Sequence, residues 1–272
     1  MDRPVIGFLS DFGSDSAAAI CRGVILSIAR DAQIVDIDHG VRKFAIGDGA
    51  FLLWAALPWL PVGVHLAVVD PGVGTSRRPV ALRVDRDDVL VGPDNGLLMP
   101  AAERLGGIVE ARAIENPRLG VGQRSATFHG RDVFAPAAAH LAAGMAFGEV
   151  GPAVDPASLV AHRFPAAQRT RDGLVAEVVY VDSFGNVRLA ATPSDLPAGG
   201  PGDRLEVVTA NGPAGGRWDL PRVVTFGEVA RGEPLLYEDS NGLLAIGVNQ
   251  DSAAARLHLA TGDRVVIRPA RA

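Results

Sequence analysis

Short runs of valine, isoleucine and leucine alternate with longer alanine- and leucine-rich segments through about residue 150, and this alternation limits the possible fold most strongly. Strands and helices that alternate along a chain are typical of a parallel sheet covered by helices. The strand-like runs are almost entirely apolar, as expected where a sheet is buried on both faces. We therefore predict an α/β N-terminal domain with a mostly parallel sheet. Its predicted strands are Val5–Ser10, Ile34–Asp38, Val64–Val69, Val80–Val84, Val89–Val91 and Ile108–Ala113, and its predicted helices are Ser16–Arg30, Ile46–Leu57, Gly96–Leu105 and Asp132–Ala143.

The pattern changes after Gly173 to short β-branched segments separated by Gly, Pro, Asn and Asp, which indicates a smaller, all-β, barrel-like domain. The proline-containing stretch Gly151–Asp172 lacks periodicity and is the predicted linker. We place the domains at residues 1–165 and 166–272. The predicted strands of the second domain are Val175–Val181, Leu205–Thr209, Val223–Phe226, Leu243–Val248 and Arg264–Arg268.

Charge and cysteine content exclude several classes of protein. The 272 residues have a formal net charge of −5, which is the wrong sign for a protein that neutralises phosphates, so nucleic acid is not an expected partner. A single cysteine, Cys21, forbids an internal disulfide and any multi-cysteine metal site. We expect a cytoplasmic protein, since the N-terminus has no signal peptide. Prolines interrupt the uncharged stretch between residues 49 and 69, so no membrane contact is expected either.

Polar residues follow the apolar runs at the points where strands of an α/β sheet deliver ligand groups. Each position also has an ordinary structural explanation: Asp11 and Asp94 suit turns or helix caps, and His129 could simply bond to the backbone. Asp70 and Arg77, seven residues apart, could form a charge pair across a loop. The fingerprints of dinucleotide, P-loop, serine-hydrolase and zinc-protease sites are missing.

Five motifs taken together closely resemble the S-adenosylmethionine hydrolases, also called S-adenosylmethionine hydroxide adenosyltransferases, which are related to fluorinases and chlorinases. The resemblance covers essentially the whole chain in the same order. The motifs are Ser10-Asp11-Phe12-Gly13, Val69-Asp70-Pro71-Gly72-Val73-Gly74-Thr75, Pro93-Asp94-Asn95-Gly96, Thr127-Phe128-His129-Gly130-Arg131-Asp132 and Asp182-Ser183-Phe184-Gly185-Asn186.

The resemblance implies a reaction in which water attacks the ribose C5′ of S-adenosyl-L-methionine and releases adenosine and L-methionine. It implies a catalytic set of Asp70, Arg77 and His129, with no metal and no cofactor, since S-adenosyl-L-methionine is the substrate. It also implies a homotrimer in which each site lies between the N-terminal domain of one subunit and the C-terminal domain of the next.

Substrate contacts are carried over by the same motifs. The resemblance assigns Asp11 to the ribose hydroxyls, and Phe44, Thr127 and Phe128 to the wall of the same region. In the C-terminal domain it assigns Asp182 to the methionine ammonium and Ser240 to its carboxylate. Adenine contacts are assigned to Phe184, Asn186, Phe226, Val248, Asn249 and Gln250, although Phe226 could equally be core filler. Asn241 replaces an arginine of the halogenases, so another group must neutralise the carboxylate or the contact is weaker.

Two other functions remain as alternatives. Halogenating relatives carry tyrosine at the positions of Asp70 and His129, and fluorinases carry threonine at the position of Val73. Because Val73 and Gly130 offer no side-chain donor for a halide, the sequence favours the hydrolase over a chlorinase- or fluorinase-like halogenase. The third alternative is a non-catalytic protein that binds S-adenosylmethionine or adenosine.

Overall fold

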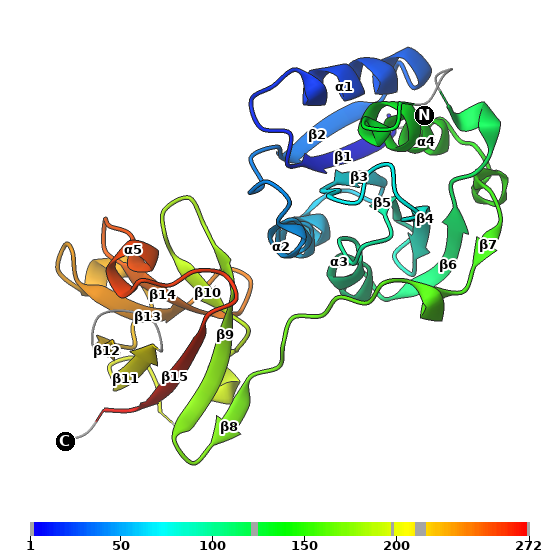
Figure 1. Ribbon diagram of the computed structural model, residues 1–272. Coiled ribbons are helices and arrows are strands. Elements are labelled where there is room, and N and C mark those ends of the chain that lie inside the picture. Colours follow the sequence, from blue (N-terminus) through cyan, green and yellow to red (C-terminus); the bar gives the residue numbers. More distant parts are fainter. Residues whose placement is uncertain (1–2, 121–124, 197–198, 210–215, 271–272) are drawn as a thin grey trace. The chain divides into compact units, whose positions relative to one another are not determined.

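A computed structural model describes residues 3–120, 125–196, 199–209 and 216–270 (Figure 1). The chain forms two compact units, Met1–Arg163 and Phe164–Ala272, each with its own sheet and core. No helix in these described ranges is both long enough and apolar enough to span a bilayer.

The first unit contains a seven-stranded sheet in the order β2-β1-β3-β5-β4-β6-β7, with helices on both faces (Figure 1). Its strands are β1 (Val5–Ser10), β2 (Gln33–Asp38), β3 (Val64–Val68), β4 (Pro79–Val84), β5 (Val89–Pro93), β6 (Ile108–Ala113) and β7 (Ala153–Val154). Its α-helices are α1 (Ala17–Ile28), α2 (Ile46–Ala56), α3 (Met99–Arg104) and α4 (Ala135–Ala142).

The prediction of a mostly parallel sheet is wrong, because the sheet is mixed. Strands β2, β1, β3 and β5 are parallel, whereas β4 pairs antiparallel with β5 and β6, and β6 pairs antiparallel with β7. Only the turn Asp85–Asp88 separates β4 from β5. A connection this short can join antiparallel neighbours but cannot make the crossover of a dozen or more residues that parallel neighbours need.

Two apolar clusters cover the two faces of this sheet. On one face, Phe8 of β1 and Leu66 of β3 pack with residues of α1 and α4. On the other face, Leu9 and Ala67 of the same strands pack with residues of α2 and α3. Consecutive strand residues point to opposite faces, so a nearly continuous apolar strand is what this two-sided burial requires. The carboxyl ends of the parallel strands are thereby held rigidly at one edge.

The second unit is built on an antiparallel, barrel-like sheet in the order β12-β11-β15-β9-β10-β14-β13, with β8 paired to β9. A bridge between Arg222, which follows β12, and Leu236 of β13 brings the two ends of this order together. The elements are β8 (Gln168–Thr170), β9 (Gly173–Val181), β10 (Val187–Leu189), β11 (Arg204–Thr209), β12 (Arg217–Pro221), β13 (Pro234–Glu238), β14 (Leu244–Val248), α5 (Ala253–Leu257) and β15 (Arg264–Pro269).

The predicted strand Val223–Phe226 is wrong, and strands β12 and β13 form on either side of this segment instead. The carboxylate of Glu228 accepts hydrogen bonds from the backbone N–H groups of Val224 (2.9 Å) and Thr225 (2.7 Å), where a strand would need them for its ladder. Phe226 consequently begins a 3₁₀ turn, Phe226–Glu228, rather than ending a strand. Capping of this kind competes locally with sheet formation.

A buried charged cluster fastens β3 to the turn between β4 and β5. Nε2 of His65 lies 2.9 Å from Oδ1 of Asp88, and both side chains are fully buried. Arg86 donates to both oxygens of the same carboxylate, and the backbone N–H of Gly63 donates to it at 3.1 Å. Burial opposes the charged form of Asp88, but the hydrogen bonds from His65 and Arg86 outweigh it and lower the pKa to about 2.

Replacing Asp88→Asn should lower the free energy of unfolding at neutral pH by about 3 kcal/mol, since breaking a buried ion pair leaves a charge without its partner. The depressed pKa means that this stabilisation is complete above about pH 4, the pKa of an unfolded carboxyl, and disappears as the pH falls through about 2. Denaturant titrations between pH 7 and pH 2 should therefore show the difference between wild type and variant shrinking. Asp87→Asn, in the same turn but exposed, is the control; an equal loss there would contradict the account.

Candidate functional site

Two aspartates lie at the carboxyl edge of the parallel strands, where the sequence places ligand groups. Strands β1 and β3 are paired in register from Ile6 opposite Val64 to Ser10 opposite Val68. Asp11 directly follows β1, and its backbone N–H donates to the carbonyl of Val68 at 3.3 Å. Asp70 comes two residues after the end of β3. Both carboxylates therefore belong to the same edge of the sheet.

Asp70, Arg77 and His129 form one contiguous group. Nε of Arg77 donates to Oδ1 of Asp70 at 3.1 Å, and Nη2 of Arg77 donates to Oδ2, which makes a bidentate ion pair. The same Nη2 lies 3.0 Å from Nδ1 of His129. The side chains of Arg77 and Asp70 are only 7% and 5% exposed, so this charge pair across the loop is shielded from solvent. The structure thus brings together all three residues of the expected catalytic set.

The contact with Arg77 fixes the proton arrangement of His129. A guanidinium can only donate hydrogen bonds, so Nδ1 of His129 must be the acceptor and carries no proton. In the neutral ring the proton is then on Nε2, which leaves Nδ1 as the one nitrogen with a lone pair. His129 can consequently accept a proton only when Nη2 of Arg77 releases Nδ1.

The third nitrogen of the guanidinium, Nη1 of Arg77, is buried and has no hydrogen-bond partner among the described residues. The ring of Phe134 lies 5.1 Å from the guanidinium carbon. Buried donors are rarely left unsatisfied, and an exception at a fixed, charged group calls for a partner such as water or a ligand. Arg77 therefore offers a rigidly held donor in a site from which bulk water is excluded.

Burial also changes the acidity of this group. Desolvation raises the pKa of Asp70 above its ordinary value, and the opposing effects of the Arg77 charge and its hydrogen bonds are smaller. The carboxylate nevertheless has to be ionised to hold Arg77 through two hydrogen bonds. Acidification consequently protonates Asp70, and weakens its ion pair with Arg77, at a higher pH than it would protonate an exposed aspartate.

Glycines permit the close packing of the loops that meet here. Gly74 has φ +77°, and a Cβ there would lie 2.5 Å from the carbonyl oxygen of Ala126, so the Asp70–Arg77 loop packs directly on the segment before His129. A Cβ on Gly130 would lie 2.8 Å from Cζ of Phe12. The ring of Phe12 thus fills the space that a side chain at position 130 would need.

The predicted helix Asp132–Ala143 begins earlier and differently, with a π-helical turn, Gly130–Phe134, ahead of α4. The backbone N–H of Ala135 donates to the carbonyl of Gly130, and Pro136 has no N–H to continue an α-helical ladder back to Asp132. Turns of this type are frequent at functional sites. Here the turn directly follows His129.

Asp11 and Phe44 are brought together by a loop that wraps around the end of β1. Oδ2 of Asp11 accepts from the backbone N–H of Phe44 at 2.9 Å, and Phe44 adopts φ 66°, a conformation uncommon for a bulky residue. The only lysine, Lys43, donates to the carbonyls of Asp11 (2.8 Å) and Phe12 (3.1 Å). Asp11 is buried, and Oδ1 has no partner in the described part of the chain, so one carboxylate oxygen is available for a ligand.

Thr127 and Phe128 lie beside these groups in the segment that leads to His129. The ring of Phe128 packs edge-on against that of Phe12, with 6.0 Å between the ring centroids. Thr127 is exposed, and its N–H lies 3.3 Å from the hydroxyl of Ser125. Phe12 and Phe128 therefore connect the Asp11 loop with the loop that carries His129.

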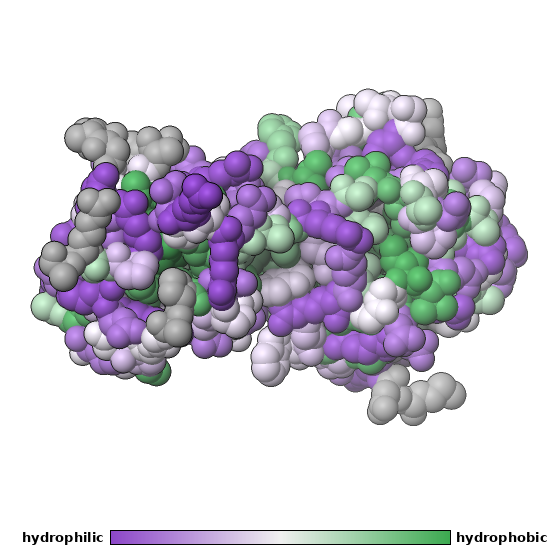
Figure 2. All heavy atoms as spheres, turned by 90° about the horizontal axis from the view of Figure 1, so that it is seen from below, coloured by the Kyte–Doolittle hydropathy of each residue, from purple (hydrophilic) through white to green (hydrophobic). Residues whose placement is uncertain are grey.

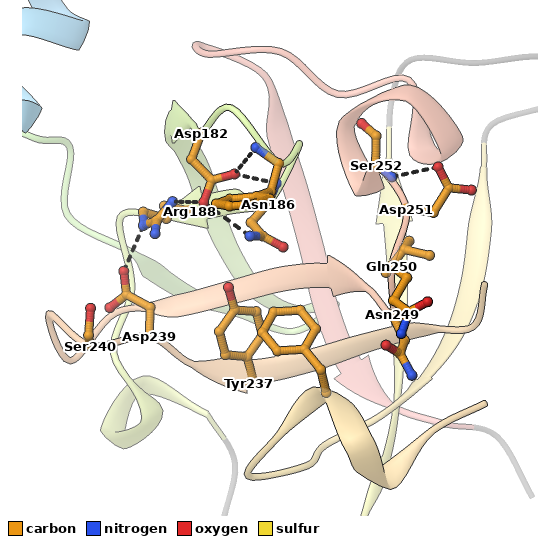
Figure 3. A pocket seen from close by; sticks show the side chains of 13 residues that line it. Asp182, Asn186, Arg188, Tyr237, Asp239, Ser240, Asn249, Gln250, Asp251 and Ser252 are labelled. Carbon is orange, nitrogen blue, oxygen red and sulfur yellow. Dashed lines mark hydrogen bonds and ion pairs between the residues drawn. The ribbon is translucent and has the colours of Figure 1, made fainter. Parts of the chain in front are cut away.

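The second unit contains a pocket of about 820 Å³ (Figure 3). All eight C-terminal residues expected from the sequence line it, although they come from segments up to 68 positions apart in the chain. These are Asp182, Phe184, Asn186, Phe226, Ser240, Val248, Asn249 and Gln250. Phe184 is 78% exposed, and the ring of Phe226 packs against that of Tyr237 with 4.9 Å between centroids. An aromatic, partly polar pocket of this size suits a nucleoside-sized ligand.

Five lining residues were not expected: Arg188, Tyr237, Asp239, Asp251 and Ser252. Arg188 links two turns, with Nη1 donating to Oδ2 of Asp182 (2.9 Å) and Nε donating to Oδ2 of Asp239 (2.8 Å). Burial opposes the charged form of Asp182, but hydrogen bonds from Asn186 and Arg188 outweigh it and lower the pKa. The period of two along β10 could have revealed Arg188, because it points to the same face as Asn186, two residues earlier.

Within residues 3–120, 125–196, 199–209 and 216–270, no group of three or more His, Cys, Asp and Glu side chains is arranged to hold an ion.

Comparison with known proteins connects both parts of the chain to one family. Residues 6–151 match the N-terminal domain of the SAM hydroxide adenosyltransferases, and residues 176–266 match their C-terminal domain. The chain belongs to the SAM hydroxide adenosyltransferase family. It shows 45% identity to the (R)-S-adenosyl-L-methionine hydrolase of Salinispora tropica, over 96% of this chain and 97% of that protein. The corresponding enzyme of Thermus thermophilus shows 43% identity over 96% and 97%.

A fluorinase from an Actinoplanes species is more distant, at 29% identity over 98% of each chain. Among solved structures, an uncharacterized conserved protein from Thermotoga maritima superimposes with a TM-score of 0.87 at 35% identity, over 96% of this chain and 99% of that one. This member of the family is therefore more similar to the named hydrolases than to the named fluorinase.

Proposed function

We propose that this member of the family hydrolyses S-adenosyl-L-methionine at the ribose C5′ and forms adenosine and L-methionine. Relatives with 43–45% identity over nearly the whole chain bear the name of that hydrolase. The observation that supports the mechanism most directly is Nη1 of Arg77, a buried donor without a described partner, on a guanidinium already fixed by Asp70 and His129. This donor is suited to hold the attacking water.

The leaving group is a neutral thioether, so the positive charge of the sulfonium disperses as the bond breaks, and a site poor in water favours that change. The protein then has to supply one well-oriented nucleophile, since in-line attack at carbon is sensitive to distance and angle. Asp70 orients Arg77, Arg77 holds the water, and His129 positions Arg77 until Nδ1 is released to take up the proton. The reaction needs no metal and no cofactor.

The substrate is held from both units in this proposal. Oδ1 of Asp11 accepts from the ribose hydroxyls, and Phe44, Thr127 and Phe128 form the adjoining wall. In the second unit the base lies between Phe184 and Phe226. Asn186 and the backbone of Val248, Asn249 and Gln250 bind the adenine edge, while Asp182 and Ser240 bind the amino-acid end of the substrate; all six residues line the pocket.

We propose that the chain acts as a homotrimer whose sites each combine the first unit of one subunit with the second unit of a neighbour. Large apolar side chains reach the surface at both units, including Phe44 (70% exposed), Trp59 (77%) and Phe184 (78%). Figure 2 shows that apolar areas lie among hydrophilic ones on the surface of each unit. Burial of these side chains between subunits would remove unfavourable apolar surface. The site of action we propose is the cytoplasm.

Coexpression of two inactive variants tests the shared site. Arg77→Ala disables the first unit, and the double variant Phe184→Ala/Phe226→Ala disables the pocket of the second. If a cyclic trimer shares sites between neighbours, every trimer that contains both variants has one intact site of its three. Differently tagged variants, purified through both tags in turn, should therefore hydrolyse substrate when mixed and not when separate. Absence of any recovery in doubly tagged material would contradict shared sites.

The relatives' names specify the (R) sulfonium epimer, and we propose the same preference for this chain. Separate incubation with each epimer should consume the (R) form faster, as followed by chromatography of adenosine. Equal rates, or faster loss of the (S) form, would contradict this preference.

The halogenase alternative conflicts with the packing around position 130. Phe12 lies where a side chain at this position would place a halide donor, and Val73 offers no hydroxyl. Incubation of the purified protein with S-adenosylmethionine in buffer without halide should give adenosine and methionine. A halogenated nucleoside that appears only after addition of halide would establish the alternative, and tight binding without any product would establish a binding protein.

A further inference from the structure

The pocket of the second unit has a charged end. In Figure 3, Asp182, Arg188, Asp239 and Ser240 lie on one side of Tyr237, whereas Asn249 to Ser252 lie on the other. Two carboxylates and one guanidinium give this end a formal charge of −1. A ligand that fills the pocket must match this arrangement at its own polar end.

The two carboxylates have already used most of their hydrogen-bonding capacity. Asp182 accepts four hydrogen bonds, from the backbone N–H groups of Phe184 and Asn186, from Nδ2 of Asn186 and from Nη1 of Arg188. Since a carboxylate offers about four acceptor sites, Asp182 is saturated. Oδ1 of Asp239 accepts from the N–H groups of Asn241 and Leu243, and Oδ2 accepts from Arg188. These aspartates hold the turns and attract cations mainly through their charge.

Arg188 differs from both aspartates in that it still has donors to offer. Nε and Nη1 are occupied by Asp239 and Asp182, but Nη2 has no hydrogen-bond partner among the described residues. The side chain is 16% exposed and lines the pocket, so its orientation is fixed by the two ion pairs while one edge faces the cavity. A planar, immobilised guanidinium with a vacant edge is suited to bind a carboxylate.

We propose that Arg188 recognises the α-carboxylate of the substrate's amino-acid end through Nη2 and thereby determines specificity for that group. This inference rests on the proposed function. The exposed hydroxyl of Ser240 supplies a second donor at the same end, and Asn241, next in the chain, brings no charge. The substrate's ammonium and sulfonium groups are balanced by its carboxylate and by the formal charge of the pocket end.

The arrangement predicts discrimination against a substrate without the carboxylate. S-adenosylmethionine that has been decarboxylated retains the sulfonium, the adenosine and an amine, so it can fill the same pocket. It leaves Nη2 of Arg188 desolvated and unpaired, however, and a site built to bind a polar group rejects an analogue that lacks it.

The test compares kcat/KM of wild type and Arg188→Gln for S-adenosylmethionine and for its decarboxylated form. The wild type should prefer the carboxylate-bearing substrate, and the variant should lose about 10- to 100-fold of that preference, the effect of one hydrogen bond to a charged group. Arg268→Gln is the matched control, because Arg268 pairs with Glu206 on the same barrel-like sheet but does not line the pocket. Equal losses on both substrates in Arg188→Gln would show a purely structural role and overturn the proposal.

A second variant separates the hydrogen bond from the net charge. Arg188→Gln leaves two uncompensated carboxylates, which by itself favours the more cationic decarboxylated substrate. The double variant Arg188→Gln/Asp239→Asn restores the formal charge of the pocket end, so only the charge contribution should return and its preference should stay well below that of the wild type. Recovery of the wild-type preference would overturn the proposal. If the wild type forms no adenosine at all, the proposed function fails, and the ratio of the two dissociation constants from calorimetry still tests Arg188.

Discussion

Arg77→Ala should reduce kcat by about 10²- to 10³-fold, the effect of removing a fixed donor from a reacting group, while the dissociation constant of S-adenosylmethionine changes little. Arg77 pairs with Asp70 and His129, whereas the residues proposed to bind the base all line the pocket of the second unit, so its removal should affect the nucleophile and not the binding of the base. Single-turnover rates and equilibrium binding, measured on the same preparation, separate the two effects.

Two further variants make the Arg77 result interpretable. Arg77→Lys retains the charge but cannot form the bidentate pair with Asp70 while also reaching His129, so we expect it to remain severely impaired. Arg83→Ala removes an arginine of the same unit that pairs with Glu110 and is 40% exposed, and it should leave kcat within about twofold because surface pairs contribute little. Unchanged turnover in Arg77→Ala would exclude the proposed role of this side chain.

Asp70→Asn is the second change with a large expected effect. The carboxamide keeps the shape of the side chain but loses the charge that holds Arg77, and kcat should fall by about 10²-fold. Burial raises the pKa of Asp70, so wild-type activity should decline as the pH falls through a value above about 4, the ordinary carboxyl pKa. Activity declines on acidification because the protonated carboxyl cannot pair with Arg77 through both oxygens.

The pH profile provides the check on Asp70. In the asparagine variant the group no longer titrates, so the acidic decline of kcat should be absent or displaced. Stability must be followed over the same range, because Asp88 titrates at lower pH and contributes to unfolding rather than to catalysis. A variant that keeps the wild-type acidic decline would assign this titration to another group.

Local sequence signals predicted much of the candidate site. Asp11 and Asp70 follow apolar runs, and the strand pairing of a parallel sheet places such positions at one edge regardless of loop details. The charge pair between Asp70 and Arg77, expected from their spacing, is confirmed. The motif that contains Asp182 forms a turn whose geometry depends on contacts within five residues, which a local pattern can specify.

The parts that the sequence did not predict depend on distant contacts or on competition between local bonds. The period of two along β10 indicates which face Arg188 lies on, but its pairing with Asp182 and Asp239, 57 positions apart, is recorded by no local pattern. The antiparallel β4–β5 hairpin was not predicted, because the apolar strands themselves give no sign of direction. Val223–Phe226 has the composition of a strand, and the carboxylate of Glu228 removes its backbone donors.

The fate of solvent oxygen shows whether water is the nucleophile. Purified protein is incubated with S-adenosylmethionine in water enriched in oxygen-18, without halide, and the products are analysed by mass spectrometry. Attack of water at C5′ predicts one heavy oxygen in the 5′-hydroxyl of adenosine and none in methionine. Unlabelled adenosine, label in methionine, or the absence of both products would contradict the account.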